Sequence, residues 1–129
     1  MVKKIGTLAV IVLVALTGCG ADAIKDLLPH ASCNAAAAFT CQDYNGPGGT
    51  ALTNFQSACA APATYSSAEC AVANRIGSCT YAPFPGVSLA TRYYSGASSP
   101  WTAGSSGTAA AACTAAGTAA GVPTTFTPN

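Results

Sequence analysis

The sequence contains little charge. Only 7% of its 129 residues are Asp, Glu, Lys or Arg, and five basic residues against four acidic ones give a formal net charge of +1. Proteins that bind nucleic acids neutralise several phosphates with clustered Lys and Arg side chains, so nucleic acid is not an expected partner. The same scarcity leaves no polybasic segment that could attract anionic lipid head groups.

Large apolar side chains are scarce after residue 18, where Ala, Ser, Thr and Gly dominate. Small side chains bury little area, and burial contributes only about 25 cal/mol per Å² of apolar surface. A chain of this length with few Leu, Ile and Phe residues is therefore marginally stable by its core alone. We expect another source of stability.

Catalytic and metal-binding motifs are also missing. His30 is the only histidine, it follows a proline in an expected exposed linker, and no two cysteines have Cys-x-x-Cys spacing. These absences argue against a zinc site, a redox-active dithiol and a histidine-dependent triad, so we expect no metal, no cofactor and no catalytic residue. The alternative is an enzyme that uses an unpaired thiol or a site built from Asp43, Glu69 and Arg75.

The first 18 residues have the order of a secretory signal peptide. Lys3 and Lys4 precede an uncharged apolar run over residues 5–16, and small residues then lead to Cys19. The run is shorter than the ~20 residues that a membrane-spanning helix needs. Two alternatives stay open, namely a permanent transmembrane helix and an ordinary signal peptide followed by an ordinary thiol.

The tetrad Leu16-Thr17-Gly18-Cys19 resembles the lipobox of bacterial lipoproteins. The resemblance implies cleavage before Cys19, thioether lipidation of its sulfur and acylation of the new amino terminus. Two or three acyl chains on one residue hold a protein stably at a membrane, whereas one chain binds reversibly. By the same resemblance, Gly20 instead of an aspartate favours the outer membrane over the inner one. The membrane is the expected partner, and we expect an envelope protein that faces the periplasm or the cell surface.

With cleavage before Cys19, we expect the chain to have four parts. Residues 1–18 are the cleaved signal peptide, residues 19–32 the lipidated amino terminus and tether, residues 33–126 a six-cysteine domain, and residues 127–129 a tail. Loss of Lys3 and Lys4 lowers the formal net charge from +1 to −1. The mature chain is short enough for one small domain.

Six cysteines remain when Cys19 carries lipid, and an oxidising compartment predicts that they form three disulfides. Six cysteines allow 15 connectivities, which a sequence cannot distinguish outright. Cys59–Cys70 is the first expectation, because it would staple the end of a helix to the following loop. Cys41 and Cys79 lie in strand-like runs and could pair across a sheet. The pair Cys33–Cys113 then remains.

Hydrophobic periodicity and turn residues predict an α+β fold. It is a small disulfide-stapled domain with a short antiparallel sheet of about three strands, packed with two short helices. The expected strands span residues 39–44, 76–81 and 87–94, with a weaker edge strand over 122–126. The expected helices span residues 50–59 and 108–116, the second stopped by Gly117. The expected loops include residues 63–67 and 82–86.

One group of side chains is a candidate interaction patch. Alternation over residues 87–94 places Arg92 and Tyr94 on one face of a strand, and Trp101 follows in a loop of Gly, Ser and Pro. An exposed tryptophan beside an arginine and a tyrosine is typical of a recognition surface. Two alternatives stay open: Arg92 and Tyr94 form a solvated face, and Trp101 covers a thin core.

The cysteine-containing motifs follow a common order. They are Cys41-Gln42-Asp43-Tyr44, a helix ending in Cys59, Cys70, Gly77-Ser78-Cys79, Tyr93-Tyr94, and a late helix carrying Cys113. This order resembles a largely uncharacterised family of small cysteine-rich bacterial lipoproteins. The chain departs from it after Cys113, where Gly117-Thr118-Ala119-Ala120-Gly121 replaces a glycine pair and tryptophan. The resemblance implies a fold and a location but no activity.

The expected function is therefore that of a non-catalytic, membrane-anchored envelope lipoprotein, a binding or structural module for a ligand or protein partner that the sequence does not identify. The alternative is an inhibitor of a secreted or periplasmic hydrolase. Small disulfide-stapled domains can present stiff loops, and proline lowers the entropy lost on binding. Residues 82–86 and 98–101 are the candidate loops.

Overall fold

The computed structural model of this protein describes residues 28–129. The predicted signal peptide, the predicted lipobox and Cys19 lie outside the described residues. The elements in chain order are β1 (His30–Ala35), the short 3-10 helix η1 (Ala36–Ala38), β2 (Thr40–Asn45), α2 (Thr50–Ala58), β3 (Thr64–Ser66), β4 (Arg75–Phe84), β5 (Val87–Tyr94), α3 (Thr108–Ala120) and β6 (Thr125–Pro128).

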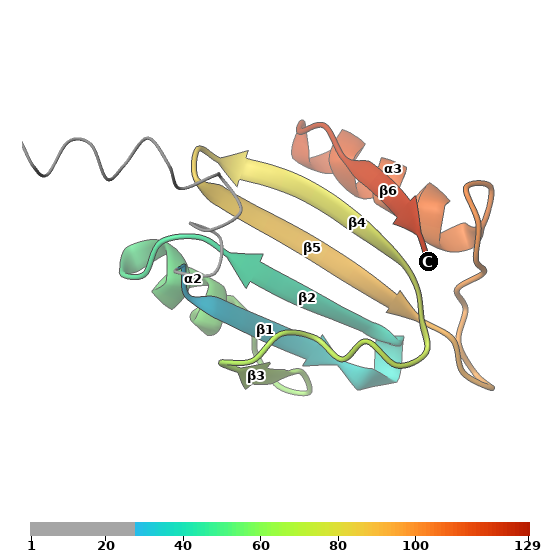
Figure 1. The fold of residues 1–129 in the computed structure, drawn as a ribbon, viewed down its shortest axis with the longest axis horizontal. Coiled ribbons are helices and arrows are strands. Elements are labelled where there is room, and N and C mark those ends of the chain that lie inside the picture. The colour runs from blue at the N-terminus through green and yellow to red at the C-terminus, as the bar shows by residue number, and fades with distance from the viewer. Residues whose placement is uncertain (1–27) are drawn as a thin grey trace, which may run out of the picture.

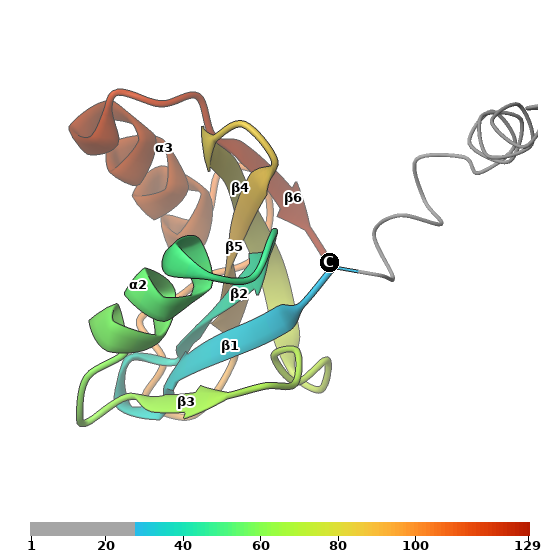
Figure 2. The ribbon, with the colours of Figure 1, turned by 90° about the vertical axis from the view of Figure 1, so that its left-hand side faces the viewer.

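The strands form one antiparallel sheet in the order β3-β1-β2-β5-β4-β6 (Figure 1). Helices α2 and α3 both lie on the same face of this sheet (Figure 2). This arrangement confirms the α+β prediction with two helices, but the sheet has six strands rather than about three. Neither helix within residues 28–129 is long and apolar enough to cross a membrane.

The core lies between the sheet and the helices and consists of two clusters. In the first, Phe55 of α2 packs on Tyr44 of β2, with ring centroids 5.3 Å apart. In the second, Tyr93 of β5 packs with Cys113 of α3 and with Trp101. Alanines of α3 fill much of the remaining contact, so each cluster is small. Small cores of this kind fit the expectation that covalent links contribute to stability.

Three strands account for the error in strand number. β1 covers residues 30–32, which were expected to belong to the tether, and His30 therefore lies in a strand rather than in an exposed linker. β3 has three residues, in a segment predicted as a loop. β6 lies two to three residues later than predicted and includes part of the expected tail. β1 consists mostly of small side chains without clear apolar alternation, whereas β3 and β6 alternate around one aromatic residue each but are too short for a sequence pattern to assign.

The hairpin of β4 and β5 is longer than expected. Strand β4 continues to Phe84, so the predicted loop over residues 82–86 shrinks to a tight turn at Pro85 and Gly86. A register shift between Tyr81 and Phe84 accommodates Pro83, which has no backbone N–H for the ladder. Gly86 has a φ of 78°, which a turn of this kind requires.

Helix α3 extends past its predicted stop. Gly117 lies inside the helix, where a Cβ atom would come within 2.7 Å of the Thr124 side chain. The glycine therefore permits the close approach of the following chain rather than ending the helix. Gly121, with a φ of 66°, provides the left-handed cap instead.

The disulfides number three, as predicted, but every predicted pair is wrong. The structure joins Cys33 to Cys59, Cys41 to Cys70 and Cys79 to Cys113.

The two faces of the sheet explain the difference. The predicted pair Cys41–Cys79 fails because β5 separates β2 from β4, and because the two side chains point to opposite faces. The predicted pair Cys59–Cys70 fails because Cys59 ends α2 on the helical face, whereas Cys70 lies on the other face. Cys33–Cys113 fails because each cysteine has a nearer partner on its own side of the core.

Candidate functional site

The face of the sheet opposite the helices carries a single crossing segment, which we call the strap and define as residues 67–74. The strap leaves β3 at one edge of the sheet and must pass β1, β2 and β5 to reach β4. Figure 1 shows it running in front of β1 and β2. The strap is rich in Ala, has no regular secondary structure over most of its length, and is attached to the sheet at a few points.

Asp43 provides the central attachment. Its side chain is on the strap side of β2 and is only 8% exposed in the folded chain. One carboxylate oxygen accepts a hydrogen bond from the backbone N–H of Cys70 at 2.6 Å, and the other accepts one from Arg92 Nε at 2.7 Å. The disulfide between Cys41 and Cys70 adds a covalent link at the same place. The middle of the strap is thus fixed to β2.

The second half of the strap is held by side chains of β4 and β5. Arg75 Nη2 donates to the carbonyl oxygens of Cys70 and Ala71, at 3.1 and 2.9 Å. The Tyr94 hydroxyl also donates to Ala71 O, at 2.7 Å. Burial raises the pKa of the Tyr94 phenol above its ordinary value, so the hydroxyl keeps its proton and remains a donor at neutral pH.

The predicted interaction patch does not form. Arg92 and Tyr94 lie on the strap side of β5, as their alternation predicted, but both are bonded to neighbouring groups. Trp101 lies on the helical side, where its ring packs edge-on against Tyr93 with centroids 4.8 Å apart. Its indole N–H donates to Ala38 O at 2.8 Å. The alternative interpretation, in which Trp101 covers a thin core, is therefore the one the structure supports.

All three residues of the alternative enzyme site contact or belong to the strap, but they form ion pairs or hydrogen bonds with other groups rather than with one another. Asp43 binds Arg92 rather than Arg75. Glu69 is 68% exposed and lies with its Oε1 3.3 Å from His30 Nδ1. All six cysteines of the described residues are in disulfides, so none of them is an available thiol nucleophile.

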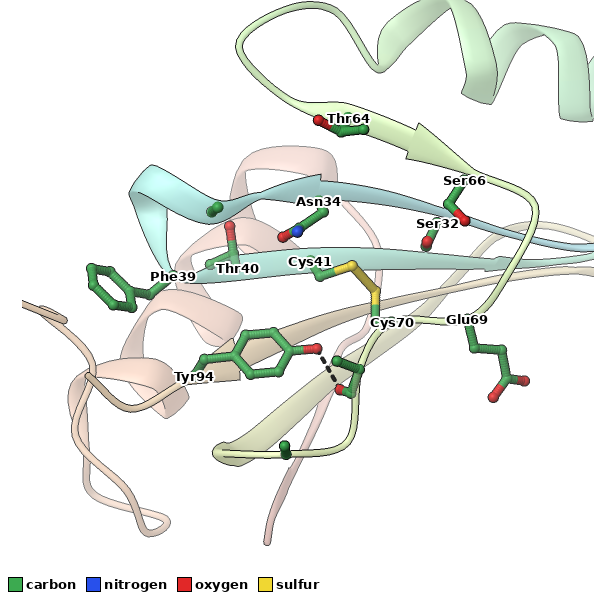
Figure 3. Close-up of a pocket in the computed structure, with 13 residues that line it drawn as sticks. Ser32, Asn34, Phe39, Thr40, Cys41, Thr64, Ser66, Glu69, Cys70 and Tyr94 are labelled. Atoms are coloured by element: carbon green, nitrogen blue, oxygen red, sulfur yellow. Dashed lines mark hydrogen bonds between the residues drawn. A yellow bond between two sulfur atoms is a disulfide. The ribbon is translucent and has the colours of Figure 1, made fainter.

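A pocket of about 420 Å³ lies between the strap and the end of the sheet where β1 turns into β2 (Figure 3). We call it the strap pocket. Its wall consists of short polar side chains, two aromatic rings, the Cys41–Cys70 disulfide and one carboxylate. The lining residues are Ser32, Asn34, Ala36, Phe39, Thr40, Cys41, Thr64, Ser66, Glu69, Cys70, Ala71, Ala73 and Tyr94.

The aromatic end of the strap pocket is held in place from several sides. Phe39 has a φ of 53°, a left-handed conformation that is an outlier for a bulky residue. Its ring lies so close to Gly96 that a Cβ there would come within 2.3 Å of the ring. Its carbonyl accepts a hydrogen bond from Tyr94 N at 3.0 Å, and Trp101 fixes the neighbouring Ala38. Of the two aromatic residues that line the pocket, Tyr94 was a candidate from the sequence and Phe39 was not. No local sequence pattern predicts that the Phe39 ring packs against Gly96.

A second hollow of about 460 Å³ lies on the other side of the strap. Its polar lining includes His30, Asp43, Glu69 and Arg92, which form the two ion pairs described above. Within residues 28–129, no three His, Cys, Asp or Glu side chains are grouped so that they could hold a metal ion.

Comparison with known protein families, with curated proteins and with solved structures finds no match to this chain. The resemblance to small cysteine-rich bacterial lipoproteins therefore stays a prediction from the sequence motifs.

Proposed function

We propose that this protein is a non-catalytic lipoprotein of the bacterial cell envelope, anchored through lipid on Cys19, and that its domain binds a ligand on the strap side of the sheet. It would belong to the cysteine-rich family that its motifs resemble, and would lie in the outer rather than the inner membrane. The domain would face the periplasm or the cell surface.

The observation that carries this proposal is the use of the cysteines. The sequence has seven, and the six in the described residues pair among themselves. Disulfides of this density are typical of small domains in oxidising compartments. The seventh cysteine follows an apolar run and small residues, where a lipobox places its lipid acceptor. Thus the pairing supports a separate role for Cys19.

Mass spectrometry of the protein isolated from its native membranes tests the proposal. We expect a chain that begins at Cys19 and carries diacylglyceryl and N-acyl groups. The variant Cys19→Ala should keep its disulfides but lose the lipid and the membrane fraction. Gradient separation of the two membranes then tests the outer-membrane assignment. A wild-type chain with an unmodified Cys19 would contradict the anchor.

One observation favours the second candidate function, inhibition of a hydrolase. Phe84 at the tip of the β4–β5 hairpin is 67% exposed, beside Pro85. An exposed aromatic ring on a stiff turn can enter a protease subsite. The other candidate loop is less suited, because Trp101 is held in the core. Wild type and Phe84→Ala should be assayed against a hydrolase panel. Absence of inhibition at about micromolar concentration removes this candidate.

A further inference from the structure

The strap pocket has the chemistry of a site for a neutral sugar. From its geometry we infer that the protein binds a neutral saccharide of one or two rings in this pocket. The inference deepens the proposed function by assigning a ligand class to its binding face, but the pocket itself does not depend on the lipid anchor. Its volume of about 420 Å³ falls in the ~300–1,000 Å³ range of small-molecule sites.

The polar wall offers hydrogen-bonding groups that both donate and accept. Asn34 and Thr64 line the pocket and lie on the strap side of β1 and β3, and within residues 28–129 their side chains make no hydrogen bond with the protein. A hydroxyl or a primary amide can donate and accept at once. Sugar hydroxyls have the same double capacity, so each wall group can pair with one of them in either direction.

The aromatic end supplies apolar surface of the kind that a sugar ring needs. Phe39 and Tyr94 both line the pocket and are only partly exposed. The C–H groups of a pyranose form an apolar face that packs on aromatic rings, while its hydroxyls point sideways to polar partners. Figure 3 shows the Tyr94 ring on the other side of β2 from Asn34, with Phe39 at the end of the pocket. Apolar and polar contacts are thus available to one ring at the same time.

The charge of the pocket excludes the main competing ligand classes. None of its lining residues is Lys, Arg or His, and Glu69 is its one carboxylate. A phosphate or carboxylate ligand would find no cation among these lining residues to pair with its charge. A wholly apolar ligand would leave the hydroxyl and amide groups of the wall without partners.

The pocket is also formed before any ligand arrives. The Cys41–Cys70 disulfide fixes one wall, and the Tyr94 hydroxyl ties its ring to Ala71 of the strap. The left-handed Phe39 has its ring against Gly96 and its carbonyl bonded to Tyr94 N. Strained residues that the surrounding structure holds in place are concentrated at binding sites. A rigid wall lowers the entropy that binding would otherwise cost.

The test uses the protein purified from membranes in a detergent without a sugar head group. Cellobiose, maltose and chitobiose are titrated and followed by saturation-transfer NMR. We expect at least one of them to bind with a Kd below about 10 mM. A glucuronic acid disaccharide should bind about ten-fold more weakly than its neutral counterpart, because its carboxylate would lose water and find no cation in the pocket.

Two pairs of matched variants locate the site. Asn34→Ala and Phe39→Ala should each weaken binding about ten-fold. Asn54→Ala on α2 and Phe84→Ala at the hairpin tip change the same residue types outside the pocket, so they should leave the affinity unchanged. Thr64→Val keeps the shape of its side chain and serves as the variant that preserves folding. It should also weaken binding.

The inference is overturned if none of the three disaccharides binds at about 10 mM, or if Asn34→Ala and Thr64→Val bind as wild type does. Stronger binding of the acidic disaccharide would also overturn it. Lipidation of Cys19 is read from the mass of the same sample, so failure of the anchor and failure of the sugar site give separate results.

Discussion

Asp43 links three parts of the molecule, because β2 carries it, the strap donates to one of its oxygens and β5 supplies its arginine. The sequence marked Asp43 as part of a cysteine-containing motif and of the alternative enzyme site, but not as an attachment point for another segment. Its role depends on Cys70 and Arg92, which are 27 and 49 residues away in the chain. Contacts at such separations come from the sheet order, which short-range patterns do not contain.

The variant Asp43→Ala should destabilise the protein by about 2–4 kcal/mol. It leaves a largely buried Arg92 without its carboxylate and the Cys70 N–H without an acceptor. Urea unfolding with intact disulfides, followed by Trp101 fluorescence, measures the change. The matched control is Glu69→Ala, whose pair with His30 is exposed and should contribute no more than ~0.5 kcal/mol. Equal losses in the two variants would contradict the central role of Asp43.

At the scale of the elements, sequence patterns predicted well those segments whose side chains alternate or cap clearly. β2, β5 and the start of α2 agree with prediction to within about one residue. The patterns failed where small side chains carry no period. Ala31 and Ser32 in β1 are almost fully buried, yet both residue types are equally common in loops. The number of disulfides followed from composition, whereas their pairing required knowledge of which face each cysteine occupies.

The same limit applies to the candidate site. Arg92 and Tyr94 were correctly placed on one face of β5, since alternation determines that. Trp101 could not be placed, because a loop of Gly, Ser and Pro gives no direction for its side chain. The strap pocket depends on a segment that crosses strands distant in sequence, so only the fold brings its wall together.

Removal of one disulfide should open the strap pocket. In the double variant Cys41→Ala with Cys70→Ala, only hydrogen bonds hold the strap to the sheet. The chain-entropy relation for a separation of 29 residues gives a loss of about 3–4 kcal/mol in the free energy of unfolding. The affinity for the disaccharide that wild type binds should fall by about ten-fold or more, because one wall becomes mobile.

The control for this variant is the double change Cys79→Ala with Cys113→Ala. Its disulfide closes a separation of 34 residues and joins β4 to α3 on the opposite face. The expected loss of stability is similar, about 3–4 kcal/mol. Its saccharide affinity should match wild type under conditions in which both variants are folded. If the two double variants lose affinity equally, the strap has no specific part in binding.

At the scale of the whole molecule, four of the five tyrosines have a raised pKa, so the folded protein favours their protonated phenols. Burial raises the pKa of Tyr44, Tyr81, Tyr93 and Tyr94 above the ordinary value of 10.0. For Tyr93 the negative charge of a neighbouring Tyr81 phenolate raises the pKa further. For Tyr81 the hydrogen bond from Gln42 opposes the effect of burial and lowers the pKa. These rings lie on both sides of the sheet, so their titration reports on the entire domain.

The protein should therefore lose stability in alkali rather than near neutral pH. A tyrosine whose folded pKa is raised stabilises the protein fully below the unfolded value of 10.0. Above that pH the unfolded chain gives up its protons first, so the free energy of unfolding falls as pH rises through the folded pKa. Urea midpoints between about pH 8 and about pH 11 measure the decline, and return to neutral pH checks reversibility. Tyr93→Phe keeps the buried ring but removes one phenol, so its stability should decline less steeply. A free energy of unfolding that stays constant to about pH 11, or an equally steep decline in Tyr93→Phe, would contradict this account.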